Sequence, residues 1–518
     1  MNNALTAIID YHQRTKHHLD RSARSLGYLD WATQPDPFRR FADATLHRLD
    51  LVDPADQPYY DAIFDPGRTP ARPFDRAAVS QLFFDSMALS AWKEFRGNRW
   101  ALRCNPSSGN LHPTEAYLIA PPVDGLTGEP GLYHYSPHEH GLEKRATFEV
   151  DAAYVGLTSI YWRESWKYGE RAFRYCHHDV GHAVAAIAIA AALLGWRARL
   201  VGCFDDDALA RLMGVETQIG IEAEHPDCLI ALDRNDVVSL NPAPLQLTGE
   251  PNRLSDSHHD WEIIDKVSTA AHRLVTNAGF ELPLGHPPAD HGEVSARNII
   301  RQRRSAVDMD GRTSIDQATF NRILGAVMPG HAPFDTLTWR PCVHLAIFVH
   351  RVADLAPGLY MLVRNEDDEQ RLRAACHDEF TWQRIGELPL YLLTESDVRQ
   401  AAKLVSCHQD IASDGAFAMG MIADFQTQLE THGAWFYKRL FWETGLLGQV
   451  LYLEAEAAGV SSTGIGCFFD DAMHDVLGID DLAFQSLYHF TVGQRVDDLR
   501  LQTHPPYAHL HQSPSQGD

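Results

Sequence analysis

Positive charge is scarce in this chain. Among its 518 residues, 45 are Lys or Arg and 69 are Asp or Glu, which gives a formal net charge of −24. A surface that binds DNA or RNA depends on clustered Lys and Arg to neutralise phosphates. The shortage argues against a nucleic-acid partner. A small anionic cofactor is still compatible with this composition, because one binding pocket needs only a few basic residues.

Long apolar runs and paired cysteines are missing as well. The longest apolar stretch, Ala183 to Trp196, is shorter than the ~20 residues that cross a bilayer. The eight cysteines are scattered singly and form no CxxC, so neither a zinc ribbon nor a thioredoxin-like motif is indicated. The N-terminus has no apolar segment of the secretory type. These features predict a cytoplasmic protein with reduced cysteines and no membrane partner.

Three common enzyme motifs are absent from the sequence: the GxGxxG of Rossmann folds, the GxxxxGK[ST] of P-loops and the GxSxG of hydrolases. Their absence leaves a Rossmann dinucleotide site, a P-loop nucleotide site and a nucleophile-elbow serine without support.

The chain contains a diverged copy of itself, because residues 181–215 align without a gap on residues 445–479. Identical residues recur at one fixed offset, and Asp179 meets Glu443 at the same offset. The matched segments are Gly181 with Gly445, Gly202-Cys203-Phe204 with Gly466-Cys467-Phe468, Asp206-Asp207-Ala208 with Asp470-Asp471-Ala472, and Gly214 with Gly478. Only two copies exist, which predicts a covalent counterpart of a homodimer.

Each copy reads as an α+β unit. A long helix (180–194 or 446–458) ends near a glycine, and a short acidic helix start and an apolar strand follow. We expect a mixed sheet flanked by helices in each unit. The predicted divisions are an N-terminal extension at 1–70, a first domain at 71–245, a linker at 246–290 and a second domain at 291–518.

Three short segments carry donors suited to phosphate or carbonyl oxygens. The turn in RCNPSSGNLHPTEAY (103–117) offers serine, asparagine and backbone donors, although, taken alone, an ordinary turn between elements is the preferred interpretation. Arginines in RQRRS (301–305), after Arg297 on a segment expected to be helical, suit a phosphate or a solvated basic helix face. Paired glycines at 464 and 466 let the backbone approach a ligand closely.

Two further residue pairs allow different chemistry. Lys167 and Tyr168 can act as a proton-transfer pair if burial lowers the Lys pKa, but sequence neighbours point apart, so pairing requires a loop or helix end. The alternative is an ordinary surface pair. His178 and His182 have metal-ligand spacing on a helix, but a third ligand is missing, so no metal site is assigned.

Together these segments resemble the nitroreductase superfamily, specifically its azoline-dehydrogenase (SagB-like) branch. The resemblance covers nearly the whole chain. It rests on RCNPSSGNLHPTEAY and YWRESWKYGERAFRYCHHDVGH in the first half, and on RQRRS, GIGCFFDDAMHDVLG and the tail RLQTHPPY in the second. It implies a nitroreductase-like fold in tandem, a pseudo-dimer within one chain, and FMN bound in the crevice between the halves.

The resemblance also implies roles for individual residues. Arg303, Arg304 and Ser305 would meet the phosphate and ribityl chain of FMN, with Arg500 as a late phosphate-side arginine. Gly464 and Gly466 would lie near the flavin. From the other half, the residues of the Arg103 segment would approach: Arg103, Pro106, Ser107, Ser108 and Asn110. Lys167 and Tyr168 match the Lys-Tyr pair implicated in catalysis by azoline dehydrogenases.

Departures from the family pattern are complementary. The first half has ARPFDRAAV where an Arg-Arg-Ser opening is expected, and the second half has TLTWRPCVHLAIF where a Pro-Ser-Ser turn is expected. The repeat places Thr431 and His432 opposite the Lys-Tyr pair. We therefore predict one complete FMN site and one catalytic centre per chain.

The resulting hypothesis is an FMN-dependent dehydrogenase or oxidase. The Lys167/Tyr168 pair deprotonates a small-molecule or modified-peptide substrate while hydride passes to flavin N5, and oxygen or another acceptor reoxidises the flavin. The alternatives are an NAD(P)H-dependent nitro or quinone reductase, a non-redox partner of a peptide-modifying enzyme, and a metal-dependent hydrolase that uses the histidines. Further pairing of chains stays open.

Overall fold

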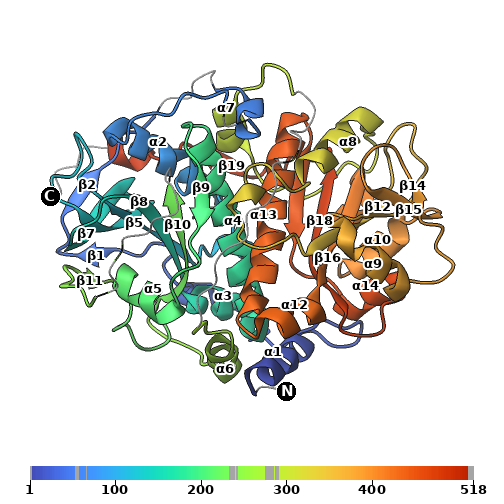
Figure 1. Ribbon diagram of the computed structural model, residues 1–518, viewed down its shortest axis with the longest axis horizontal. Helices are drawn as coiled ribbons and strands as arrows, with labels where there is room; N and C mark the ends of the chain where they lie inside the picture. The colour runs from blue at the N-terminus through green and yellow to red at the C-terminus, as the bar shows by residue number, and fades with distance from the viewer. Residues whose placement is uncertain are drawn as a thin grey trace.

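The computed structural model describes residues 3–52, 58–65, 67–232, 240, 243–274, 285 and 291–511. Two seven-stranded sheets stand on either side of two long central helices, α4 (Ala172–Ala192) and α13 (Phe436–Ala457) (Figure 1). The arrangement confirms the α+β fold in tandem. The predicted domain and linker boundaries stay predictions.

The two sheets share one topology. The first has the order β2 (Leu46–Arg48), β7 (Gly141–Thr147), β6 (Gly131–Ser136), β5 (Thr114–Ala120), β8 (Ala153–Ser159), β10 (His225–Leu232), β9 (Ala198–Leu200). The second has the order β14 (Gln383–Arg384), β15 (Leu390–Glu395), β13 (Gly358–Leu362), β12 (Val343–Val349), β16 (Phe417–Asp424), β18 (Phe484–Gly493), β17 (Ser461–Ile465). From β7 and β15 onward, the strands occur in the same chain order, as the internal duplication requires.

Shorter helices surround this frame. The first half and its N-terminal extension contain α1 (Asn3–Arg14), α2 (Arg76–Ser86), α3 (Tyr161–Tyr168) and α5 (Asp206–Met213), and α6 (Glu262–Ala270) follows. The second half contains α7 (Ala296–Gln302), α8 (Gln317–Ala326), α9 (Glu369–Ala375), α10 (Arg399–Val405), α11 (Asp410–Asp414), α12 (Phe425–His432) and α14 (Asp470–Leu477). No helix in the described ranges is long and apolar enough to cross a membrane.

Helices α4 and α13 meet at the two glycines that the repeat aligns. A Cβ on Gly181 would lie 2.8 Å from the Cα of Gly445, and a Cβ on Gly445 would lie 2.8 Å from the Cα of Gly181. Each would also press on a backbone carbonyl of the opposite helix, Trp442 or His178, which are themselves aligned by the repeat. The contact is therefore reciprocal, as at the two-fold axis of a homodimer.

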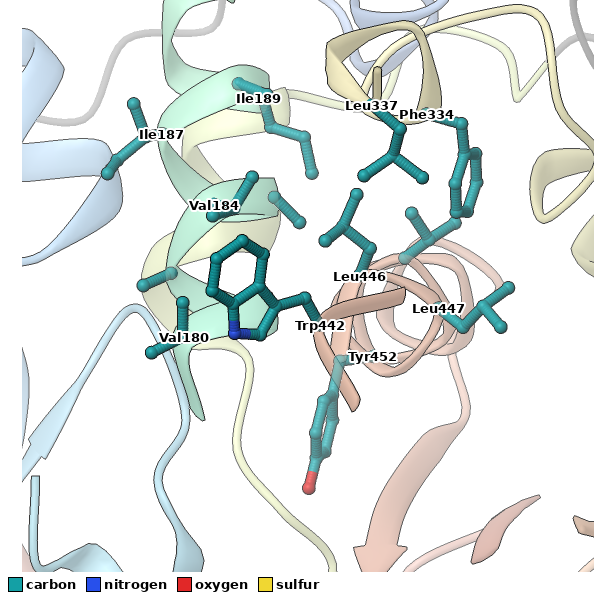
Figure 2. Packing of buried hydrophobic residues seen from close by; sticks show 14 of the residues in the cluster. Val180, Val184, Ile187, Ile189, Phe334, Leu337, Trp442, Leu446, Leu447 and Tyr452 are labelled. Carbon is teal, nitrogen blue, oxygen red and sulfur yellow. The ribbon is translucent and has the colours of Figure 1, made fainter. Parts of the chain in front are cut away.

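Apolar side chains extend this contact into a shared core. Val180, Val184 and Ile189 of α4 lie near Trp442 and Leu446 of α13 (Figure 2), and all five side chains are buried. One continuous cluster includes strands and helices of both halves. The interface between the halves is thus packed like the core of a single domain, because burying the apolar faces of both helices removes them from water.

Two buried ion pairs repeat this symmetry between the halves. Lys438 Nζ lies 2.8 Å from Asp206, and Arg174 at the aligned position lies 2.7 Å from Asp470. Arg171 also pairs with Asp470 at 3.0 Å, and Arg273 lies 3.6 Å from Asp206. The paired charges lower the pKa of both carboxyls, although burial opposes this. Each half therefore supplies cations to the other half's short acidic helix: Lys438 to Asp206, and Arg171 and Arg174 to Asp470.

Replacing Lys438 with methionine is expected to lower the free energy of unfolding by about 2 kcal/mol, since a buried hydrogen-bonded charge loses one partner while Arg273 remains. A urea titration monitored by tryptophan fluorescence measures the loss. Lys266→Met serves as control, because its ion pair with Glu262 is exposed. Equal stabilities of the two variants would contradict the proposed weight of the inter-half pair.

The two ends of the chain cross to the opposite halves. The N-terminal α1 packs on the second half, where His12 contacts Tyr437 and Gln485 (Figure 1). Near the C-terminus, β19 (Gln502–His504) pairs with β3 (Leu89–Phe95), which also pairs with β4 (Asn98–Arg103). Each half is therefore completed by a segment that the other end of the chain supplies.

Candidate functional site

Both halves and the N-terminal segment line one cavity of about 530 Å³, which we call the inner cavity. The first half contributes the turn between β4 and β5 and residues of α3 and α4, while the second half contributes the end of β17 and the loop after it. Its lining includes Ser107, Ser108, Gly109, Lys167, Tyr168, Tyr175, Asp179, Ser305, Tyr452, Gly464, Gly466, Cys467 and Tyr488.

The turn at Pro106–Asn110 is held by its own backbone conformation. Gly109 and Asn110 have φ of 61° and 57°, a region that glycine adopts freely and asparagine tolerates. The backbone N–H of Ser108 donates to the Asp179 carboxyl of α4 at 3.1 Å, and the hydroxyl of Ser107 accepts from the N–H of His112 at 2.8 Å. Pro106, Ser107, Ser108 and Asn110 all line the inner cavity, and their role in binding a ligand stays a prediction.

Lys167 and Tyr168 meet at the end of α3. The helix ends at Tyr168, and Gly169 follows with φ of 54°, which provides the helix end that pairing of sequence neighbours requires. A Cβ on Gly109 would lie 2.7 Å from the Tyr168 hydroxyl and 2.9 Å from Lys167 Nζ. The ammonium and the phenol therefore lie against the same glycine at the wall of the inner cavity, an arrangement suited to proton transfer.

Two buried carboxyl groups lie behind this pair. Burial raises the pKa of Asp179 to about 7, although hydrogen bonds from Ser107 and Ser108 oppose the shift. Burial and the charge of Asp179 raise the pKa of Glu164, which lies one helical turn before Lys167. Burial lowers the pKa of Lys167, and Glu164 opposes this effect. The site can thus hold protons near neutral pH.

A second cavity of about 530 Å³, the outer cavity, continues from the first. Pro106, Ser107, Asn110 and Ser305 line both. The outer cavity collects basic side chains from four segments, because Lys93, Arg103, Arg303, Arg304 and Arg495 all belong to its lining. The two cavities together form one path with a polar, donor-rich middle and a cationic end.

Two arginines of the outer cavity, Arg303 and Arg304, differ from Arg495, which pairs with Asp497 at 2.9 Å. In the described part of the chain, neither Arg303 nor Arg304 forms an ion pair, and Arg303 Nε is buried without a hydrogen-bond partner. Burial, together with the charge of Arg303, lowers the pKa of Arg304 to about 10. Uncompensated buried cations are costly, so the arrangement suits an anionic ligand such as a phosphate.

Arg303 to Ser305 do not lie on a helix, which differs from the expected helical segment. Helix α7 ends at Gln302, and Ser305 forms a parallel bridge with Ser462 beside β17. The Ser305 hydroxyl lies 2.9 Å from that of Tyr452, which accepts from the N–H of Gly464 at 3.0 Å. Leaving the helix turns these residues into the cavities, while Arg301, still helical, stacks on Phe84.

The remaining predicted residues separate into two groups. Gly464 and Gly466 line the inner cavity, where a Cβ on Gly466 would lie 2.5 Å from the Tyr175 ring. Arg103 is buried at the outer cavity and donates to the Pro37 carbonyl at 2.7 Å. Arg500 lines neither cavity: its side chain is 76% exposed and pairs with Asp498. Its phosphate role stays a prediction.

Several lining residues were missed by the sequence reasoning. Arg495 follows β18 and joins the outer cavity, and Tyr452 and Tyr488 line the inner cavity. His17, Ser22, Ala23 and Ser25 bring the N-terminal segment to the same cavity. These residues belong to the predicted N-terminal extension, in which no sequence pattern indicated a ligand-facing residue. The tyrosines stand at helix and strand positions that read as ordinary core.

The pseudo-equivalent position in the other half is filled by large side chains. By the repeat, Trp435 and Arg439 correspond to Arg171 and Tyr175, and both are buried. The Arg439 guanidinium lies 4.7 Å from the Trp435 ring and 4.9 Å from that of Trp339. Leu200, also buried, takes the position of Gly464. At this pseudo-equivalent position, large side chains pack on one another, whereas the corresponding residues of the other crevice line the inner cavity.

The two histidines with metal-ligand spacing have other neighbours. His178 Nε2 lies 3.0 Å from the Leu487 carbonyl, and His182 lies near Gln449 and Tyr488 at 3.4 Å each. Across the described ranges, no group of three or more His, Cys, Asp or Glu could hold a metal ion.

Comparison with known proteins gives consistent matches. A model of the nitroreductase family matches residues 68–232 and 300–494. A candidate nitroreductase of Methanocaldococcus jannaschii is 29% identical over 127 residues, which cover 21% of this chain and 63%, less than two thirds, of that relative. The crystal structure of a candidate nitroreductase from Anabaena variabilis covers 95% of this chain and 99% of its own, with 22% identity and a TM-score of 0.69. The likeness of fold extends over both halves.

Proposed function

The chain belongs to the nitroreductase family, and on that premise we propose that it is an FMN-dependent oxidoreductase of the azoline-dehydrogenase (SagB-like) type. We place one FMN site between the two halves of the chain. The substrate class is a small molecule or modified peptide that gives up a proton and a hydride from neighbouring atoms of one ring.

The lining of the two joined cavities suits the parts of FMN in turn. Arg303, Arg304 and Arg495 would hold the phosphate. Arg303 and Arg304 form no ion pair among the described residues, and Arg495, although paired with Asp497, remains partly exposed. Ser107, Asn110 and Ser305 line both cavities and suit the ribityl hydroxyls. Gly464 and Gly466 remove side chains from the wall of the inner cavity, where a planar ring needs close backbone approach.

Bound FMN supplies the acceptor for a substrate hydride. The chain's own residues handle the proton. Lys167, whose pKa burial lowers, accepts the substrate proton at Nζ, and the Tyr168 hydroxyl beside it donates to the substrate and fixes its position. Glu164 lies behind Lys167, and Asp179 lines the inner cavity, so both can pass that proton onward. The observation that carries the proposal is this Lys-Tyr pair at the wall of a cavity continuous with the arginine cluster.

We expect about one FMN per polypeptide, and Arg304→Ala to weaken FMN binding about 10- to 100-fold, because a charge-assisted hydrogen bond contributes about 1.5–3 kcal/mol. The absorption spectrum of purified protein and fluorescence titration with FMN measure both. Arg301→Ala is the matched control from the same motif, since its side chain stacks on Phe84 outside both cavities. Arg495→Ala and Arg500→Ala decide which late arginine meets the phosphate.

Three outcomes would contradict this assignment. Protein that takes up no flavin even with added FMN would leave the non-redox partner as the better reading. Two FMN per chain would show that the second position also binds, despite Trp435 and Arg439. Rapid bleaching by NAD(P)H, without bleaching by an azoline substrate, would favour a nitro or quinone reductase instead.

A further inference from the structure

Two cysteines far apart in the sequence meet at the inner cavity. The sulfur atoms of Cys407 and Cys467 lie 2.6 Å apart, and Cys467 lines the cavity directly. Cys407 stands between α10 and α11, whereas Cys467 follows β17 and precedes α14. The two cysteines do not form a CxxC motif, because they are 60 positions apart in the sequence and only the fold brings them together.

Hydrogen bonds on either side hold the two segments in register. The backbone N–H of Phe469 donates to the Val405 carbonyl at 2.8 Å, and the Gln409 side chain donates to the Cys467 carbonyl at 3.0 Å. The Cys407 backbone has φ of 54°, in the left-handed region, two residues after the end of α10. The contact between the sulfurs is therefore fixed by both chain segments rather than by two free side chains.

The two thiols differ in environment. Cys467 is exposed, while Cys407 is half-buried. The contact with Cys407 and the nearby charge of Arg171 lower the pKa of Cys467, although burial opposes this, and the contact with Cys467 and burial raise the pKa of Cys407. An exposed sulfur with a lowered pKa beside a half-buried thiol with a raised pKa is the arrangement of an attacking and a resolving cysteine.

We propose that Cys467 and Cys407 form a dithiol site at the inner cavity that reduces small disulfides by thiol–disulfide exchange. The Cys467 thiolate attacks one sulfur of a small disulfide, the S–S bond breaks, and the leaving thiolate takes a proton. The Cys407 thiol then loses its proton and attacks Cys467 in the mixed disulfide, which releases the second small thiol. One disulfide is reduced to two thiols, and the protein dithiol is oxidised to a Cys407–Cys467 disulfide.

The pseudo-symmetric position supplies an internal comparison. The repeat aligns Cys203 with Cys467, and Cys203 is exposed too. In the described part of the chain, Cys203 forms no contact with another sulfur, and burial raises the pKa of its thiol. Exposure is thus common to the two positions, while the partner sulfur and the lowered pKa belong to Cys467 alone.

The test uses the purified full chain with oxidised glutathione, followed by intact-mass measurement and peptide mapping without reduction. Wild-type protein is expected to lose two hydrogen atoms and to yield a Cys407–Cys467 cross-linked peptide, with reduced glutathione released. Cys407→Ser is expected to stop at a stable glutathione adduct on Cys467. Cys467→Ser is expected to form neither product, and Cys203→Ser to behave as wild type.

Three results would overturn the proposal. An adduct that persists on Cys467 of the wild-type protein would show that Cys407 does not resolve it. Equal rates of adduct formation at Cys203 and Cys467 would show that the pairing gives no added reactivity. A loss of two hydrogen atoms and release of reduced glutathione in Cys467→Ser, as in the wild type, would assign the chemistry to other cysteines. The exchange requires no flavin, so its failure is distinct from failure of FMN binding.

Discussion

Lys167→Ala is expected to slow substrate oxidation by about 100- to 10,000-fold, the usual contribution of a positioned acid–base group. Its Nζ lies at the cavity wall against Gly109, away from the arginine cluster, so FMN content is expected to stay at the wild-type level. The measurement is anaerobic bleaching of the flavin band in a single turnover with a synthetic peptide that contains one thiazoline ring.

Matched variants separate a proton-transfer role from a structural one. Thr431→Ala alters the position that the repeat aligns with Lys167 and is expected to leave the rate unchanged, because Thr431 is exposed and outside both cavities. Lys167→Arg keeps the charge but holds its proton, so it is expected to remain slow. Wild-type bleaching rates in Lys167→Ala would remove the residue from the mechanism.

Gly445→Val is expected to destabilise the protein on the order of 5 kcal/mol or more, at the upper end of single substitutions. The valine Cβ would lie within 2.8 Å of the Gly181 Cα and close to a backbone carbonyl, neither of which can rotate away as a side chain does. Helices α4 and α13 would have to separate along their shared core. Loss of folded protein on expression, or a large fall in the urea midpoint, is the expected observation.

A smaller substitution, Gly445→Ala, tests the same contact through the sign of the change in the free energy of unfolding. In a free helix interior, Gly→Ala stabilises by about 1 kcal/mol. Gly445→Ala is expected to do the reverse, because the added Cβ meets backbone of the facing helix. Gly128→Ala is the control, since a Cβ there would meet nothing within 4 Å. Stabilisation by Gly445→Ala would show that the two helices do not pack as closely as described.

The sequence predicted the tandem architecture because the duplication leaves identical residues at one constant offset along the chain. Glycines 181 and 445 were recognised as aligned partners, and they turn out to touch one another across the pseudo-two-fold axis. That contact could not be read from the alignment, which relates positions without placing them in space. The same holds for Asp206 and Asp470: their equivalence was visible, while their exchanged cations were not.

The candidate site was predicted where a motif keeps its residues together. Ser107 and Ser108 share one turn, and Lys167 and Tyr168 share one helix end, so local sequence was enough to bring each group to the cavity. Arg495 and Tyr452 reach the cavities only through long-range packing, which no local pattern records, and the same packing brings Cys407 to Cys467. Arg303 and Arg304 were expected to continue a helix, but the chain leaves the helix at Gln302 to pair beside β17.

Covalent linkage of the two halves releases this protein from a restriction that binds every homodimer. When one gene encodes both subunits, any substitution appears at both crevices, and neither can change without the other. Here Trp435 and Arg439 occupy one crevice while Arg171 and Tyr175 line the other. A mutation in one crevice leaves the residues of the other crevice unchanged. One crevice can therefore accumulate substitutions that fill it with packed side chains, while selection for catalysis acts on the other crevice alone.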